Sequence, residues 1–190
     1  MARKFLSFLS VLMMFNATYA FAGVVGTGSV GVAIPSLQIG DIEEGGDAGY
    51  MVGGSVGFRF SKWIQWDVLE TYYMSADQHD QYESYMYTGS NWTVGSGFRF
   101  GQFSEDSRFH PYASIGLAGS RTNIESGYSY TWQWGFEWNA GVGFLYDFGE
   151  ETALGIRYRY RSTRISSLLG YPVNLNVNIH TVGIEFAWGR

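Results

Sequence analysis

The stretch WQWGFEWNAGVGFLYDF, residues 132–148, alternates bulky apolar side chains with small or polar ones along nearly its whole length. Nine even-numbered positions from Trp132 to Phe148 are apolar or aromatic, whereas the odd-numbered positions include Gln133 and Glu137. Successive side chains of a strand point to opposite faces, so this pattern predicts a strand with one apolar and one polar face. Strands in soluble proteins have about five or six residues, whereas a bilayer-crossing strand needs roughly nine to eleven. We therefore expect a membrane-spanning strand.

The same two-residue period occurs in seven other segments after Gly23. They are residues 24–34, 50–60, 63–73, 92–100, 111–119, 152–161 and 175–188. Two of them break the alternation. In residues 63–73, Glu70 falls on the same face as the apolar, outward side chains such as Tyr72, which is the wrong face for a carboxylate. In residues 175–188, Val177 and Ile179 have the opposite phase to the apolar residues after them. Because a β-bulge shifts the phase by one residue, we predict one bulge at Glu70 and another near His180.

The eight segments are joined alternately by short and long connections. The short ones are residues 61–62, 101–110 and 149–151, and the long ones are residues 35–49, 74–91, 120–131 and 162–174. Short turns at one end and long loops at the other are typical of outer-membrane barrels, with the turns in the periplasm. The predicted fold is an all-β, eight-stranded antiparallel transmembrane barrel with four longer extracellular loops and both chain ends in the periplasm.

The N-terminal residues have the pattern of an export signal. Arg3 and Lys4 precede an apolar run over residues 5–15, and Ala20-Phe21-Ala22 fits the small-residue rule for signal peptidase. We predict a cleaved signal peptide over residues 1–22 and a barrel domain over residues 23–190, integral to the bacterial outer membrane. No later window has the 18 or more apolar residues of a spanning helix.

The composition supports this interpretation and excludes others. The chain has no cysteine, 26 glycines, only 3 prolines and 18% aromatic residues. Disulfides are therefore excluded, and few prolines suit many hydrogen-bonded strands. The mean hydropathy of −0.08 is expected when each spanning strand is only half apolar. With a formal net charge of −5 and no basic arm after the export signal, no nucleic-acid partner is expected.

A soluble lipocalin-like barrel has the same period but places its apolar residues inside. Nine bulky groups in a row, three of them tryptophans, would overfill such a small interior. The rings also gather near the strand ends, as in the aromatic girdles of membrane barrels. The turn-side rings are Trp63, Phe100, Phe148 and Trp188, and the loop-side rings are Tyr72, Trp92, Trp132 and Tyr160. This distribution favours the membrane barrel.

Nine charged residues are predicted to point into the barrel. They are Arg59, Asp67, Arg99, Glu137, Asp147, Arg157, Arg159, Arg161 and Glu185. Glu137 is expected roughly across from Arg161 on the neighbouring strand, and Arg59 within a diagonal step of Asp67. An eight-stranded barrel is just wide enough for side chains to fill, so a paired polar plug is the favoured interpretation. The alternative is a narrow, anion-preferring channel along Arg157, Arg159 and Arg161.

The chain resembles a known family in its export signal, its eight strands and two short motifs. These are PYASIGL at residues 111–117 and GIEFAW at residues 183–188. They are similar to the outer-membrane β-barrel domain family, which includes the OmpA membrane domain and the opacity-type surface proteins. The resemblance implies an assembly signal at Gly183, Phe186 and Trp188 that the barrel-assembly machinery recognises. It specifies architecture rather than chemistry.

Catalysis is not expected from the residue pattern. The three histidines are His79, His110 and His180, and Thr181 follows His180, so the His-x-Ser arrangement of a lipid A deacylase is missing. No nucleophile, base and orienting acid come together in the sequence pattern. A lipid-modifying enzyme is thus the less favoured alternative, and neither a cofactor nor a metal ion is expected.

The second long connection carries several tyrosines, among them Tyr82, Tyr85 and Tyr87. Tyrosines on an exposed polar loop suit adaptable surface contacts, so these three are candidate contact residues for a surface ligand. The other expected partners are outer-membrane lipid and lipopolysaccharide. The predicted function is a structural or surface-interaction role in the outer membrane, without enzymatic activity.

Overall fold

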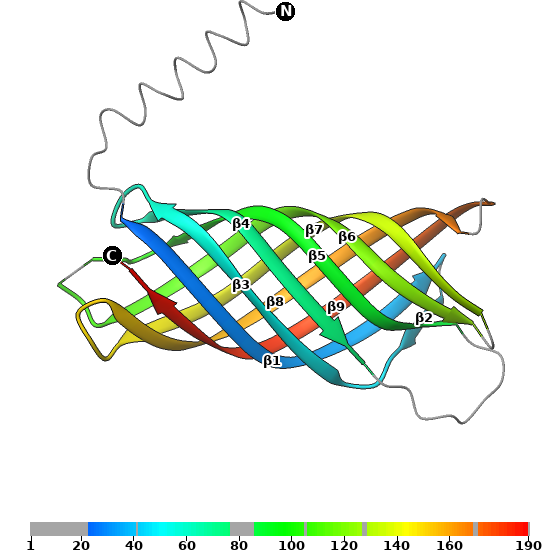
Figure 1. The fold of residues 1–190 in the computed structure, drawn as a ribbon, viewed down its shortest axis with the longest axis horizontal. Helices are drawn as coiled ribbons and strands as arrows, with labels where there is room; N and C mark the ends of the chain where they lie inside the picture. The colour runs from blue at the N-terminus through cyan, green and yellow to red at the C-terminus, as the bar shows by residue number, and fades with distance from the viewer. Residues whose placement is uncertain are drawn as a thin grey trace, which may run out of the picture.

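The computed structural model describes residues 23–40, 42–76, 86–104, 106–126, 129–168 and 171–189. These residues form one antiparallel sheet of strands that run obliquely along a cylinder (Figure 1). The strands are β1 Val24–Ile39, β2 Ile42–Gly45, β3 Gly49–Arg59, β4 Ile64–Ser75, β5 Met86–Gly101, β6 Phe109–Ser126, β7 Ser129–Asp147, β8 Thr152–Leu168 and β9 Tyr171–Trp188. Within the described residues, no helix is long and apolar enough to cross a membrane.

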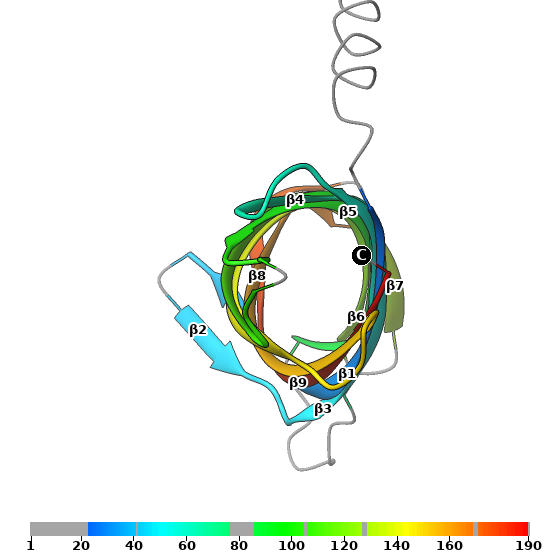
Figure 2. The same ribbon diagram turned by 90° about the vertical axis from the view of Figure 1, so that its left-hand side faces the viewer.

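Eight of these strands close into a barrel. Neighbours pair in the order β1, β3, β4, β5, β6, β7, β8 and β9, and β9 pairs back with β1 to complete the ring (Figure 2). Strand β2 pairs only with the end of β1 and lies outside the ring. The predicted eight-stranded antiparallel barrel is therefore confirmed, with β2 as an additional hairpin strand.

The two ends of the barrel differ in how far the strands extend and in how they are joined. At one end, tight turns join β3 to β4 and β7 to β8, and the start of β1 and the end of β9 lie there too (Figure 1). At the other end, the strands continue well past the predicted boundaries: β6 extends to Ser126 and β8 to Leu168. Much of the connection between β6 and β7 is thus a paired ribbon rather than a loop, because polar residues such as Thr122 and Gln133 continue the hydrogen-bonded ladder.

The bulge predicted at Glu70 is confirmed. In the ladder between β3 and β4, the consecutive residues Val56 and Gly57 of β3 pair with Leu69 and Asp67 of β4. Val68 is therefore the extra residue in β4. Val68 and Leu69 both face outward, and Glu70 is turned into the barrel. The same shift turns Tyr72 inward, so its predicted outward position in the loop-side girdle is wrong.

The bulge predicted near His180 is wrong. Strand β9 pairs with β1 and with β8 without interruption on both sides of that residue. Val177 and Ile179 instead point into the barrel and are completely buried. Their phase is continuous with that of Glu185 further along the strand. They break the expected pattern because part of the interior is apolar, not because the strand is irregular.

Candidate functional site in the barrel interior

The lumen contains a layer of charged side chains that pair with one another. Arg99, on β5, donates from Nε to Asp67 Oδ2 at 2.6 Å and lies with Nη1 2.7 Å from Glu185 Oε1. Strands β5 and β9 are four places apart in an eight-strand ring, so the contact between Arg99 and Glu185 spans the lumen. Tyr112 also donates a hydrogen bond to Glu185. Carboxylates and arginines thus connect opposite walls.

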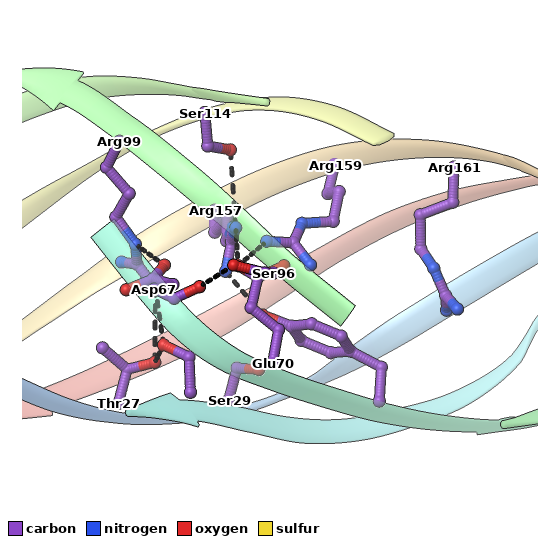
Figure 3. Close-up of polar contacts among 12 residues, drawn as sticks. Thr27, Ser29, Asp67, Glu70, Ser96, Arg99, Ser114, Arg157, Arg159 and Arg161 are labelled. Carbon is purple, nitrogen blue, oxygen red and sulfur yellow. Dashed lines mark hydrogen bonds and ion pairs between the residues drawn. The ribbon is translucent and has the colours of Figure 1, made fainter. Parts of the chain in front are cut away.

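Glu70 is the second centre of this layer, and the sequence prediction missed it. Its Oε1 accepts a hydrogen bond from Arg159 Nη2 at 2.7 Å and lies 3.7 Å from Arg157 Nη2 (Figure 3). Arg157 also lies 3.5 Å from Glu185. The signal that could have identified Glu70 is the bulge itself, because a one-residue phase shift places this carboxylate among the inward residues.

Arg161 and Glu137 form a further ion pair, on the neighbouring strands β8 and β7. Arg161 donates from Nε to Oε1 at 3.0 Å and from Nη2 to Oε2 at 2.9 Å, which is a two-pronged contact. The same guanidinium donates to Asn91 Oδ1 at 2.8 Å and to Thr93. The structure thus brings together the two residues that the sequence placed roughly across from each other.

The ring of Tyr72 lies among the three arginines of β8. Its centroid is 4.4 Å from the Cζ atom of Arg159 and 5.8 and 5.7 Å from those of Arg157 and Arg161. Arg157 Nη1 also donates to the Tyr72 hydroxyl at 2.8 Å. The ring stabilises the neighbouring guanidinium groups, because cations within about 6 Å of a ring centroid interact favourably with it.

The buried charges of this layer balance. The four arginines Arg99, Arg157, Arg159 and Arg161 meet the four carboxylates Asp67, Glu70, Glu137 and Glu185, and all eight side chains are buried. Unpaired charges are costly to remove from water, whereas paired and hydrogen-bonded charges are tolerated. The charged layer therefore behaves as a neutral, cross-linked filling of the lumen.

The two remaining predicted charges, Arg59 and Asp147, lie at the turn end of the barrel. Arg59 sits diagonally to Asp67 in the ladder, but its guanidinium lies 5.0 Å from the ring centroid of Phe103, while Asp67 pairs with Arg99. Asp147 Oδ2 is 2.7 Å from His110 Nε2. These groups are therefore separate from the central charged layer.

A second, apolar layer lies in the lumen towards the loop end, on one side of it, next to the buried polar residues Asn91 and Thr122 of β5 and β6. It is a cluster of nine buried side chains from β1, β3, β4, β8 and β9. They are Ala33, Leu37, Met51, Tyr72, Met74, Ile165, Leu175, Val177 and Ile179. Tyr72 belongs to both layers, since its ring packs with this cluster and its hydroxyl contacts Arg157. The two layers are therefore in direct contact.

The predicted assembly residues lie at the turn end of β9. Gly183 faces the lumen opposite Gly31, and a Cβ atom at position 183 would lie 2.6 Å from the carbonyl oxygen of Val30. Phe186 and Trp188 face outward with their ring centroids 5.9 Å apart. The residue types at these three positions thus suit a close strand contact and an aromatic rim.

The candidate loop residues are placed only in part. Tyr82 and Tyr85 lie outside the described residues, as does His79. The backbone of Tyr87 lies in β5, paired with Glu125 of β6, and its side chain is not described. Tyr87 is therefore part of the strand ladder rather than of the connecting loop.

The described histidines do not assemble a hydrolytic site. His180 Nδ1 is 2.8 Å from the Tyr158 hydroxyl on the outer surface, whereas Thr181 points inward and donates to the Arg159 carbonyl at 3.2 Å. His110 pairs with Asp147 and with the Gln102 carbonyl oxygen at 2.8 Å from Nδ1. Among the residues that the structure describes, no group of three or more His, Cys, Asp or Glu could hold a metal ion.

Three solved structures of other proteins are similar to this chain over most of its length. The chain is 16% identical to Neisserial surface protein A, covering 86% of this chain and 95% of that one, with a TM-score of 0.55. It is 12% identical to Ail, the attachment invasion locus protein of Yersinia pestis, with 86% and 98% covered and a TM-score of 0.47. It is 6% identical to the outer membrane protease OmpT from Escherichia coli, with 88% and 97% covered and a TM-score of 0.48. Among curated proteins, none matches the sequence.

The likeness to Neisserial surface protein A supports the fold and not a shared activity, because one architecture serves many functions. The family comparison is independent of this likeness. Residues 7–189 match the family described as the outer membrane protein beta-barrel domain, which is almost the entire sequence. The closed antiparallel barrel, its apolar outer surface and its neutral polar filling agree with that match. The chain therefore belongs to the outer membrane protein β-barrel domain family.

Proposed function

We propose that the protein is a non-conducting, non-enzymatic barrel of the outer membrane with a structural or surface-interaction role. The observation that carries this proposal is that mutually paired charges occupy the lumen and that an apolar cluster adjoins them towards the loop end. An ion path needs groups that replace the hydration shell of the ion, and an apolar constriction opposes water and ions by dewetting. Both layers act against conduction.

The row of inward arginines on β8 is the reason to keep an anion-preferring channel as the second candidate. Each of Arg157, Arg159 and Arg161 has a carboxylate within 4 Å, so their charge is already compensated. An anion would have to displace Glu70 or Glu137 from these contacts. This competition favours the sealed barrel over the channel.

Single-channel recording in a planar bilayer tests the proposal. Purified protein, shown to be folded and inserted by its protection from protease, is expected to give no discrete current steps at several salt concentrations. A matched variant with Val177→Gly, Ile179→Gly and Met74→Gly opens the apolar layer and shows whether the charged layer alone seals the lumen. Reproducible, anion-selective steps from the unaltered protein would establish the channel and overturn the sealed barrel.

The same proposal includes how the chain reaches the membrane. Residues 1–22 serve as a cleaved export signal, and Gly183, Phe186 and Trp188 serve as the signal for the barrel-assembly machinery. The position of these three residues at the end of the last strand, beside the first strand, supports a role in closing the ring. N-terminal sequencing of the membrane-inserted protein is expected to start at Gly23.

The surface-interaction part of the proposal rests on the connection between β4 and β5, with Tyr82 and Tyr85 as its contact residues. A lipid-modifying enzyme is less favoured, because His180 is hydrogen-bonded to Tyr158 and its neighbour Thr181 points to the opposite face. Incubation of the refolded protein with lipid A, followed by mass spectrometry, is expected to show no loss or transfer of acyl chains. A changed lipid A mass would overturn the non-enzymatic assignment.

A further inference from the structure

Two arginines lie on the outward face of the barrel instead of in the lumen. Arg121 on β6 and Arg164 on β8 are both exposed and flank β7. In the strand ladder, Arg121 pairs with Trp134 and Arg164 pairs with Phe136. Within the described part of the chain, neither guanidinium contacts a carboxylate. Each is thus a positive charge with no carboxylate partner among the described side chains, and the exposed residues nearest to the two arginines include the apolar Leu117, Trp134, Phe136 and Trp138.

Their height along the barrel places them at the outer rim of the apolar surface. Arg121 is twelve residues along β6 from the outward Phe109, and Arg164 is twelve residues along β8 from Thr152, the ladder partner of Trp188. Twelve residues at about 3.3 Å each, tilted by about 45°, rise about 28 Å. The apolar band of an outer-membrane barrel is about 25 Å tall, so both arginines lie at headgroup level on the loop side.

Tryptophan rings hold one of these charges in place. The Cζ atom of Arg121 lies 4.9 Å from the ring centroid of Trp132 and 5.8 Å from that of Trp134. Trp134 is 72% exposed, the largest fraction among the exposed large apolar side chains of the described residues. A guanidinium that stacks on a ring still presents N–H donors at its edge, and that planar fork matches phosphate oxygens. Trp132 and Trp134 thus orient the guanidinium of Arg121 at the outer end of the apolar surface.

We propose that Arg121, Trp132, Trp134, Phe136 and Arg164 form a binding site for the phosphorylated headgroup of an outer-leaflet glycolipid, that is, lipopolysaccharide. The two arginines are two strands apart, about 10 Å, and bracket the aromatic ridge of β7. Phosphate groups bind the guanidinium edges, and the acyl chains lie along the apolar surface below, at residues such as Leu117 and Trp138. The proposal depends on residence in the outer membrane and not on whether the lumen conducts.

This site can be distinguished from a general attraction of basic residues to a membrane, because the chain has a similar contact between a cation and a tryptophan at the opposite rim. Lys62, in the turn between β3 and β4, lies with Nζ 5.6 Å from the ring centroid of Trp63. It is also an exposed cation beside an exposed tryptophan, but on the periplasmic side, where the leaflet is phospholipid. Lys62→Gln is therefore the control for a loss of one cation–π contact at a membrane rim.

The test is native mass spectrometry of the full chain, refolded in zwitterionic detergent and titrated with purified bis-phosphorylated lipid A. A basic side chain near an anionic lipid surface contributes about fivefold in affinity, so we expect the double variant Arg121→Gln, Arg164→Gln to bind lipid A about 25-fold more weakly. Lys62→Gln should bind like the unaltered protein. Dephosphorylated lipid A should bind the unaltered protein and the double variant equally.

Two further titrations identify the ligand source. Phosphatidylglycerol should bind at least fivefold more weakly than bis-phosphorylated lipid A, and millimolar inorganic phosphate should not displace bound lipid A. Equal binding of lipid A by the double variant and the unaltered protein, or equal binding of its phosphorylated and dephosphorylated forms, would overturn the site. Because all these substitutions are on the exposed surface, folding is checked by the same protease protection used for the conductance experiment.

Discussion

The guanidinium of Arg159 contacts the carboxylate of Glu70 at 2.7 Å across the lumen, between strands β8 and β4. The two residues are 89 positions apart in the sequence, and their strands face each other in the eight-strand ring. This contact and the one between Arg99 and Glu185 connect opposite walls. The filling of the barrel is therefore part of what holds its cross-section together.

Glu70→Gln removes the carboxylate charge that faces Arg157 and Arg159. We expect the free energy of unfolding to fall by about 3–5 kcal/mol, because breaking a buried ion pair leaves uncompensated charge in a low-dielectric interior. Urea-induced unfolding of the refolded protein in lipid vesicles measures the change. Glu150→Gln, at an exposed position in the turn between β7 and β8, is the control and should have an effect below about 0.5 kcal/mol. Equal stabilities of the two variants would contradict a structural role for Glu70.

Deletion of Val68 removes the bulge in β4. The pairs Val56–Leu69 and Gly57–Asp67 would then follow one another without a break, and Asp67, Glu70 and Tyr72 would keep their inward faces. We therefore expect the deletion variant to refold, measured by the heat-dependent shift in gel mobility of folded barrels. Deletion of both Val68 and Leu69 shifts the phase by one residue, so Asp67 or the pair Glu70 and Tyr72 must turn outward, and this variant should not refold. Failure of the single deletion to refold would show that the bulge itself is needed.

Tyr72 has two separable contributions, its ring and its hydroxyl. Tyr72→Phe loses only the hydrogen bond from Arg157 and should destabilise the barrel by about 1.5–3 kcal/mol, the usual value for a bond to a charged group. Tyr72→Leu also loses the aromatic face beside the three arginines and should cost more than Tyr72→Phe. The two variants are compared by urea unfolding. If their stabilities are equal, the contacts of the ring with the arginines contribute nothing measurable.

The connection between β4 and β5 is expected to be dispensable for folding only as far as residue 85. Replacing residues 78–85 by a short Gly/Ser linker should leave the thermal midpoint unchanged. Extending the replacement through Thr88 also removes three residues of β5 that lie in the ladder with β6, and it should lower the midpoint. Thermal scans of the two variants test this boundary. Loss of any surface binding activity in both variants would assign that activity to residues 78–85.

Trp188→Ala is expected to slow assembly in cells more than it lowers the stability of the refolded barrel. The residue lies on the outward face at the end of β9, where it stacks on Phe186, so its loss removes part of the proposed assembly signal. Trp63→Ala removes another exposed tryptophan at the same end of the barrel, outside β9, and is the control. Pulse-chase labelling with protease protection gives the assembly rate. Equal rates for the two variants would exclude a specific signal at Trp188.

Several features could be predicted from the sequence because they depend on neighbours along a strand or across one ladder. The alternation around Glu137 determines which side chains face inward, and the short turn after β7 places Arg161 on the adjacent strand. The bulge at Glu70 followed from the same rule. Its consequence for Tyr72 was missed because the phase shift also applies to every later residue of β4.

The sequence by itself determined that eight alternating segments form strands, which face of most of them is apolar, and where one strand is bulged. Only the tertiary structure decided which charges meet across the lumen and that Val177 and Ile179 belong to an apolar layer. The physical reason is the geometry of the closed barrel. The two-residue period specifies whether a side chain points into or out of the barrel. The height of each residue along the barrel axis depends instead on the stagger between paired strands. Residues such as Glu70 and Arg159 therefore reach the same level only once the ring is closed.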